Sequence, residues 1–277
     1  MKKILSLSIL LTLCSGLFAQ ETVIRIGTDK TDLILKVANG GRLYQTYFGK
    51  SLKNASETAV FPWDEYGDPD GLDTVRGGEA YSTSGNEDYY EPALGIIHND
   101  GNRTTYLYYN GHEQKAVEGG TETIIRLSDK VYPVSVTLHY VAFKEENIIK
   151  TWSEISHNEK KPVTLTQYAS GMVYLKREAY FLNEYNSDWA KEVRQSTEQL
   201  QFGKKLLDSK QGSRAAEMVQ PFFEIGMGRP AAENEGEVLL GQIGWVGNFR
   251  FIFEVDNHGV LRVISGINPY ASDYKLN

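Results

Sequence analysis

One acidic and aromatic stretch, from Phe61 to Asn102, holds the side chains best suited to chemistry. It reads FPWDEYGDPDGLDTVRGGEAYSTSGNEDYYEPALGIIHNDGN and interrupts an otherwise regular strand pattern, as functional loops often do. The carboxylates of Asp64 and Glu65 can accept hydrogen bonds from sugar hydroxyls. Arg76 can donate them, and the ring of Trp63 offers an apolar face to a pyranose. We therefore consider this stretch a candidate for sugar recognition.

The same acidic residues admit two other interpretations. Read as a calcium loop beginning at Asp68, the segment supplies acidic side chains at the third and twelfth positions, Asp70 and Glu79. However, Leu72 and Asp73 stand where the EF-hand pattern needs an oxygen ligand and a glycine. The EF-hand pattern therefore fails, and a calcium site of another kind or a solvated structural loop remains as the alternative to sugar binding.

The rest of the chain shows no motif of nucleophilic, metal-dependent or nucleotide chemistry. G-x-S-x-G, H-E-x-x-H, the phosphate loop and the dinucleotide fingerprint are all absent from the sequence. We predict that His112-Glu113 and Ser156-His157 are solvated neighbours in polar turns. His139 is predicted to lie on the polar face of a strand as a surface or packed side chain. We expect no catalytic residue, no metal site and no cofactor in this chain.

The first 20 residues have the organisation of a secretory signal peptide. Lys2 and Lys3 precede an apolar run from Ile4 to Leu13, which is shorter than the roughly 20 residues that span a bilayer. Cleavage near Ala19 predicts a periplasmic or secreted product. The alternative, a lipid anchor on Cys14, has a poor match because Leu13 precedes the cysteine. Removal of residues 1–20 leaves no cysteine and so no disulfide.

Composition favours a secreted all-β protein without nucleic-acid or membrane-spanning functions. The net charge is −7, and 17 Tyr and 26 Gly accompany only 8 Pro. No Lys/Arg-rich run offers a nucleic-acid surface. After residue 20, no apolar stretch reaches the length of a membrane span.

The elements that must position the acidic stretch are predicted to be strands. Residues 134–142 alternate, with Val134, Val136, Leu138, Tyr140 and Ala142 on one face. Residues 249–267 predict a hairpin that turns at DNHG and places Phe249, Phe251 and Phe253 on one face. The strongest helix candidate is SDWAKEVRQS, capped by Ser187. These signals favour a large antiparallel sandwich.

Several separated blocks resemble the N-terminal domain of bacterial α-galactosidases of glycoside hydrolase family 36. The first is the early YFGK, and the second joins Gly85, Asp88, Tyr89, Pro92 and Ala93. Two further blocks are 236–238 with 247–249, GEV and GNF, and 266–269, GINP. The chain departs from the pattern at AAEMVQPFF, which keeps only Pro221 and Phe222 of a longer family motif that includes a histidine and an asparagine. No role of that histidine or that asparagine is therefore assigned to this chain.

The resemblance implies one large all-β domain over residues 21–277, an antiparallel β-supersandwich of the galactose-mutarotase-like kind. In the family a (β/α)₈ barrel follows and carries two catalytic aspartates, so the resemblance implies that SGINPYASDYKLN leads into a barrel absent from this chain. It also implies subunit contacts in a homo-oligomer and a loop that reaches the sugar pocket. By position, the family's acidic residue in that loop falls on Asp64 or Glu65 and its arginine falls near Arg76.

Two hypotheses follow. The first is the noncatalytic N-terminal domain of a secreted α-galactosidase, which would meet its α-galactoside only with the barrel and be inactive alone. The second is a stand-alone carbohydrate-binding or structural β-sandwich. The genomic sequence downstream would discriminate between them.

Overall fold

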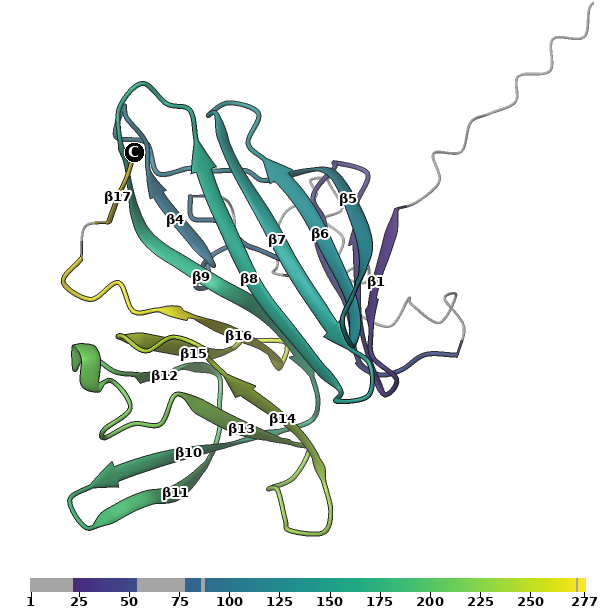
Figure 1. The fold of residues 1–277 in the computed structure, drawn as a ribbon, viewed down its shortest axis with the longest axis vertical. Coiled ribbons are helices and arrows are strands. Elements are labelled where there is room, and N and C mark those ends of the chain that lie inside the picture. The colour runs from purple at the N-terminus through teal and green to yellow at the C-terminus, as the bar shows by residue number, and fades with distance from the viewer. Residues whose placement is uncertain (1–21, 54–77, 86–87, 273) are drawn as a thin grey trace, which may run out of the picture.

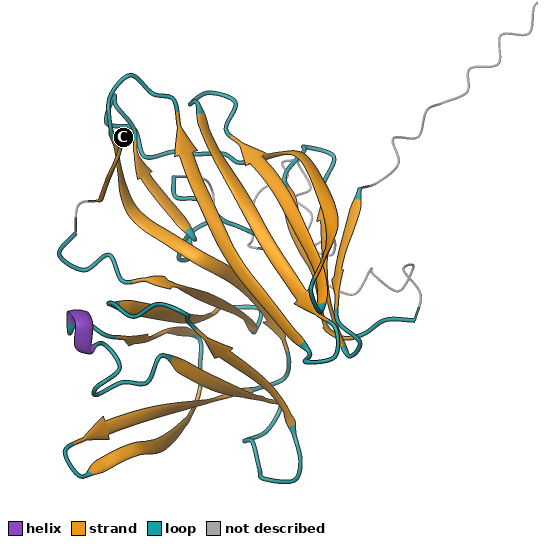
Figure 2. Ribbon diagram, viewed as in Figure 1, coloured by secondary structure: helices purple, strands orange, loops and turns teal. Residues whose placement is uncertain are grey.

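The computed structural model describes residues 22–53, 78–85, 88–272 and 274–277. Strands dominate these residues (Figures 1 and 2). Two sheets comprise β1 (Val23–Gly27), β2 (Thr31–Val37) and β3 (Leu43–Lys50), and then β5 (Tyr108–Val117), β6 (Gly120–Ser128), β7 (Val134–Phe143) and β8 (Ile148–His157). None of the described residues forms a helix with the length and apolar character needed to cross a bilayer.

The other strands form a central and an outer sheet. The central sheet has the order β12-β15-β16-β9-β17, with β4 also paired to β9. Its strands are β4 (Leu94–Ile97), β9 (Val163–Lys176), β12 (Gly203–Asp208), β15 (Phe249–Val255), β16 (Val260–Ile267) and β17 (Tyr274–Leu276). The outer sheet, of order β11-β10-β13-β14, contains β10 (Tyr180–Asp188), β11 (Lys191–Gln199), β13 (Phe222–Met227) and β14 (Glu237–Gln242). A 3₁₀ turn, η2, spans Gly212–Arg214.

The central sheet is buried on both faces. One face, with Ile252 and Ile264, packs into a core shared with β1–β3 and β5–β8. The opposite face presents Phe251 and Val263 to a second core, which the outer sheet closes. Figure 1 shows β15 and β16 between these two groups of strands. Within the described residues, all pairs between numbered strands are antiparallel, so the predicted all-β antiparallel fold is confirmed.

Alternation of apolar residues explains why these strands form where they do. The five residues predicted to share a face of β7 are all buried, from Val134 to Ala142. Phe249, Phe251 and Phe253 lie together in the second core, each at most 1% exposed. The predicted DNHG turn joins β15 to β16, where the Asp256 carboxylate accepts hydrogen bonds from two backbone N–H groups.

The predicted helix at SDWAKEVRQS is wrong. Those residues form the end of β10, a turn at Trp189-Ala190 and the start of β11. Ala190 has φ +57, which the turn requires and a helix interior excludes. Every residue of β11 is exposed. The strand therefore shows no apolar alternation. Its residues with high helix propensity led to the incorrect prediction of a helix.

Two histidine-containing pairs of residues were predicted to lie in turns, and this prediction is also wrong. His112-Glu113 lies within β5 and Ser156-His157 at the end of β8, not in turns. His139 is packed, as one alternative predicted. Its ring stacks on Trp152 with centroids 4.5 Å apart, and Nδ1 lies 2.9 Å from the Glu122 carboxylate.

Candidate functional site

Three neighbouring strand ends of the central sheet converge on one surface, which we call the junction surface. It comprises the loops 209–221, 243–248 and 268–272. The surface arises because Asp208, at the end of β12, pairs with Arg250 on β15, which in turn pairs with Gly266 near the end of β16. Loops that are distant in the sequence therefore leave the sheet side by side.

Two asparagines link these loops. Asn268 is 3% exposed, and its Nδ2 donates to Asp208 Oδ2 and to the carbonyl of Ser209, both at 3.1 Å. The N–H of Asn268 donates to the carbonyl of Asn248 at 3.0 Å, and Oδ1 of Asn248 accepts from the N–H of Gly212 at 2.6 Å. Because buried polar groups are costly unless paired, this pattern fixes the loops relative to one another. The residues of the GNF and GINP blocks thus meet in space.

Large apolar side chains stand exposed on the same surface. Trp245 is 45% exposed, Val246 85%, Tyr270 55% and Met218 52%. Single exposed apolar residues are ordinary, but several on adjacent loops are typical of a surface that contacts another protein or domain. The junction surface therefore has the character of a docking surface.

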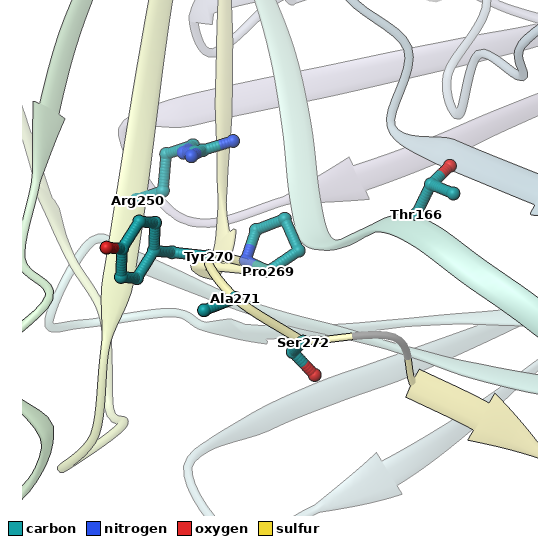
Figure 3. Close-up of a pocket in the computed structure, with 6 residues that line it drawn as sticks. All are labelled: Thr166, Arg250, Pro269, Tyr270, Ala271 and Ser272. Atoms are coloured by element: carbon teal, nitrogen blue, oxygen red, sulfur yellow. The ribbon is translucent and has the colours of Figure 1, made fainter.

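An open pocket of about 530 Å³ lies beside these loops (Figure 3). Its lining residues come from β9, β15 and the segment after β16: Thr166, Arg250, Pro269, Tyr270, Ala271 and Ser272. The Arg250 guanidinium lies 3.8 Å from the Asp208 carboxylate, and its Nε is buried without a hydrogen-bond partner among the residues that the structure describes. Lys210 Nζ lies 5.0 Å from the centre of the Tyr270 ring. This lining offers donors and an aromatic ring.

A second constellation is buried between the central sheet and the segment that precedes β4. Arg262 donates to the Asp88 carboxylate and to the carbonyl of Glu91, both at 2.7 Å. Glu254 accepts from the N–H of Glu91 at 2.7 Å. Asp88 and Glu91 of this stretch are thus held in a buried network, whereas Tyr89 is 91% exposed.

The acidic residue next to this network has an altered pKa. Glu79 forms an ion pair with Arg42, and both side chains are nearly buried. Burial raises the pKa of Glu79 to about 7, and the nearby Asp88 carboxylate acts in the same direction, although Arg42 opposes both. The Glu79 carboxyl group is therefore paired with Arg42. This pairing does not favour a role for Glu79 as a calcium ligand.

The predicted sugar-contacting residues Trp63, Asp64, Glu65 and Arg76 lie outside the described residues. The described chain fixes only the two points between which their segment runs. Leu52 donates its N–H to Asp32 at 2.7 Å, and the carbonyl of Gly78 accepts from the N–H of Gln45 at 2.7 Å. Of the flanking described residues, Leu52 therefore lies just past the end of β3 and Gly78 lies alongside β3.

Sequence reasoning missed Arg262, Arg250 and Trp245. Arg262 was difficult to identify, because only its position within a mostly apolar strand indicates a buried ion pair. Arg250 likewise sits between two phenylalanines of β15. Trp245 lies in a glycine-rich loop, and nothing local distinguishes it from a buried tryptophan.

Comparison with known proteins gives one family. The model that matches is described as the glycosyl hydrolase family 36 N-terminal domain and covers residues 41–277. The α-galactosidase Mel36A of Lactobacillus acidophilus is 24% identical over 93% of this chain, which spans 38% of that relative. The α-galactosidase AgaA of Geobacillus stearothermophilus is 26% identical over 93% of the chain, again 38% of the relative.

Solved structures show the same fold. A crystal structure of AgaA superposes with a TM-score of 0.82 at 23% identity, covering 92% of this chain and 38% of AgaA. An AgaA variant in complex with raffinose gives a TM-score of 0.84 with the same coverage. The chain thus spans about two-fifths of the length of these relatives.

Proposed function

The chain belongs to the glycosyl hydrolase family 36 N-terminal domains, and we propose that it serves as the noncatalytic β-domain of an α-galactosidase-like enzyme. The observation that carries this proposal is the family match over residues 41–277, in a chain that spans 38% of its α-galactosidase relatives. By this proposal the whole enzyme acts on α-galactosides such as raffinose, the sugar bound in one AgaA structure. Its chemistry would be supplied by a catalytic domain.

The junction surface is the face that we propose to contact the catalytic domain. Its exposed Trp245, Val246 and Tyr270 would be removed from water in such a contact, and each large apolar side chain contributes roughly 1.5–3 kcal/mol when fully buried. The buried bonds of Asn268 hold the loops in place before contact. A preorganised surface avoids much of the entropy lost on docking.

Residues 63–65 and 76 are proposed to reach the sugar only within the complete enzyme. Small sugars bind in concave sites with several convergent polar groups, and a single loop provides too few. We also propose export to the periplasm or beyond, which the pattern of residues 1–20 supports.

A fusion experiment tests the docking proposal. Residues 22–277 replace the matching N-terminal part of AgaA, and hydrolysis of raffinose is measured. We expect the fusion to be active and the change of Trp245→Asp with Val246→Asp to reduce its rate at least about tenfold through loss of docking. The matched control is Gln195→Asp with Gln199→Asp on exposed β11, which should leave the rate unchanged. Equal rates in soluble, folded fusions with both pairs of changes would contradict the assignment of the surface.

A further inference from the structure

The Arg250 guanidinium has an incomplete set of hydrogen-bond partners in the described part of the chain. Arg250 lies on β15 between Phe249 and Phe251 and lines the pocket beside the junction surface (Figure 3). Its Nε is buried and unpartnered there, and the guanidinium lies 3.8 Å from the Asp208 carboxylate, which is too far for a hydrogen bond. The side chain is only 23% exposed. Arginine carries five N–H donors, and burying donors without acceptors is unfavourable.

The charges around Arg250 are also unbalanced. The Asp208 carboxylate lies 3.8 Å from the Arg250 guanidinium and 3.6 Å from Nζ of Lys210, so one negative charge is shared by two positive charges. Arg214 and Glu217, on the loop 209–221, pair with each other and add no net charge. Counting these described residues, the pocket has an excess of one positive charge, although the whole chain has a net charge of −7.

The pocket is part of the junction surface. Tyr270 and Ala271 belong to the loop 268–272 of that surface and also line the pocket. Tyr270 is 55% exposed, and its ring centre lies 5.0 Å from Nζ of Lys210. Ala271 has φ +52, in the left-handed region that is unfavourable for alanine, and backbone strain of this kind clusters at sites that hold ligands or partners. A domain that covers the junction surface would therefore also close this pocket.

We propose that the pocket receives the carboxylate of one aspartate or glutamate side chain of the catalytic domain, which pairs with the Arg250 guanidinium. This inference rests on the proposed function, because it requires a catalytic domain on the junction surface. A carboxylate has two acceptor oxygens in one plane, which match the fork of N–H donors on an arginine. Its negative charge also balances the excess positive charge of the pocket.

Charge and accessibility favour this occupant over others. A sugar hydroxyl or a backbone carbonyl can accept a hydrogen bond from Arg250, but it leaves the excess charge in place while docking removes water from the pocket. A charge without a partner becomes more costly as it is buried. A free carboxylate or phosphate ion would find few convergent groups in an open pocket of about 530 Å³. A side chain on the docked domain is brought there by the rest of the contact.

Replacement of Arg250 in the AgaA fusion tests the proposal. We expect Arg250→Met to lower the rate of raffinose hydrolysis at least about tenfold, and Arg250→Lys, which keeps the charge, to recover part of that loss. The matched control, Arg126→Met, removes a half-exposed arginine of β6 and should leave the rate unchanged. In the chain alone, Arg250→Met should not lower the urea midpoint, because the side chain gives up no hydrogen bond to a described residue.

The fusion with Trp245→Asp and Val246→Asp separates this inference from docking itself. Loss of rate with that pair of changes but not with Arg250→Met would overturn the role of Arg250 and leave the docking assignment intact. Loss with neither would remove the docking assignment and this inference with it. A lower urea midpoint for the isolated Arg250→Met chain would show that Arg250 acts within the domain, and would also overturn the proposal.

Carbodiimide coupling identifies the partner of Arg250 directly. The Arg250→Lys fusion is treated with a water-soluble carbodiimide, which joins an amine to a carboxylate in contact with it, and the linked peptides are identified by mass spectrometry. We expect position 250 to be joined to an aspartate or glutamate of the AgaA catalytic part. Coupling of position 250 only to Asp208, or no coupling in a fusion that hydrolyses raffinose, would overturn the proposal.

Discussion

The side chain of Asn268 bridges two loops by donating from one nitrogen to Asp208 Oδ2 and to the Ser209 carbonyl, each at 3.1 Å. Asn268 is almost completely buried and lies just after β16, whereas Asp208 ends β12. This contact joins parts of the chain that are 60 residues apart and sets the shape of the junction surface.

Replacing Asn268 with alanine should destabilise the domain. The change removes the side-chain donor from the buried carbonyl of Ser209 and one hydrogen bond from the partly exposed Asp208 carboxylate, which costs about 1–3 kcal/mol. The free energy of unfolding in urea measures the effect, and Gln199→Ala on exposed β11 serves as the control. If both variants unfold at the same urea concentration, the asparagine does not have the structural role assigned to it.

Replacing Arg262 with methionine should be more costly. Arg262 and Asp88 form an ion pair with side chains only 4% and 6% exposed. Loss of one partner leaves a buried charge uncompensated, which typically costs 3–5 kcal/mol. Arg126→Met breaks the half-exposed pair with Glu113 and should cost no more than about 1 kcal/mol. Guanidinium denaturation of the two variants provides the comparison, and similar losses would show that the Arg262 pair is not buried in solution.

Glu79 should make stability depend on pH. Burial raises its pKa from 4.5 to about 7, so the folded protein binds a proton that the unfolded chain releases between those values. The stability associated with this group is therefore fully present below about pH 4.5 and is lost as pH rises through about 7. Urea midpoints measured at several pH values should fall over this window in the wild type.

The Glu79→Gln variant isolates that contribution. It cannot titrate, so the difference between its midpoint and that of the wild type should change with pH over the same window. Other groups, including the histidines, remain in both proteins and cancel in the difference. A difference that is constant from pH 4.5 to 8 would show that the carboxyl has an ordinary pKa in the folded state.

The strands with one buried face were predictable from sequence, and those without one were not. In β7 alternate residues enter the core, so the period of two is visible in the sequence. Strand β11 is exposed throughout and reads as polar helix formers, so its hairpin partner β10, not its own pattern, determines its conformation. The same reason explains His112, whose strand β5 is largely exposed.

The junction surface could be predicted only in part. The GNF and GINP blocks drew attention to Asn248 and Asn268 through the family resemblance. Their proximity to Asp208 depends on the pairing of β12, β15 and β16, which local patterns do not specify. The sugar-contacting roles of Trp63, Asp64, Glu65 and Arg76 stay predictions, since these residues lie outside the described part of the chain.

The proposal that this chain is a noncatalytic domain is tested by its own rate of hydrolysis of 4-nitrophenyl α-galactoside. The purified chain, shown to be folded by a cooperative urea transition, is assayed beside a mock preparation and beside AgaA. We expect a rate equal to that of the mock preparation, because the family resemblance assigns the catalytic carboxylates to a barrel. Turnover clearly above the mock preparation that copurifies with the chain would contradict it.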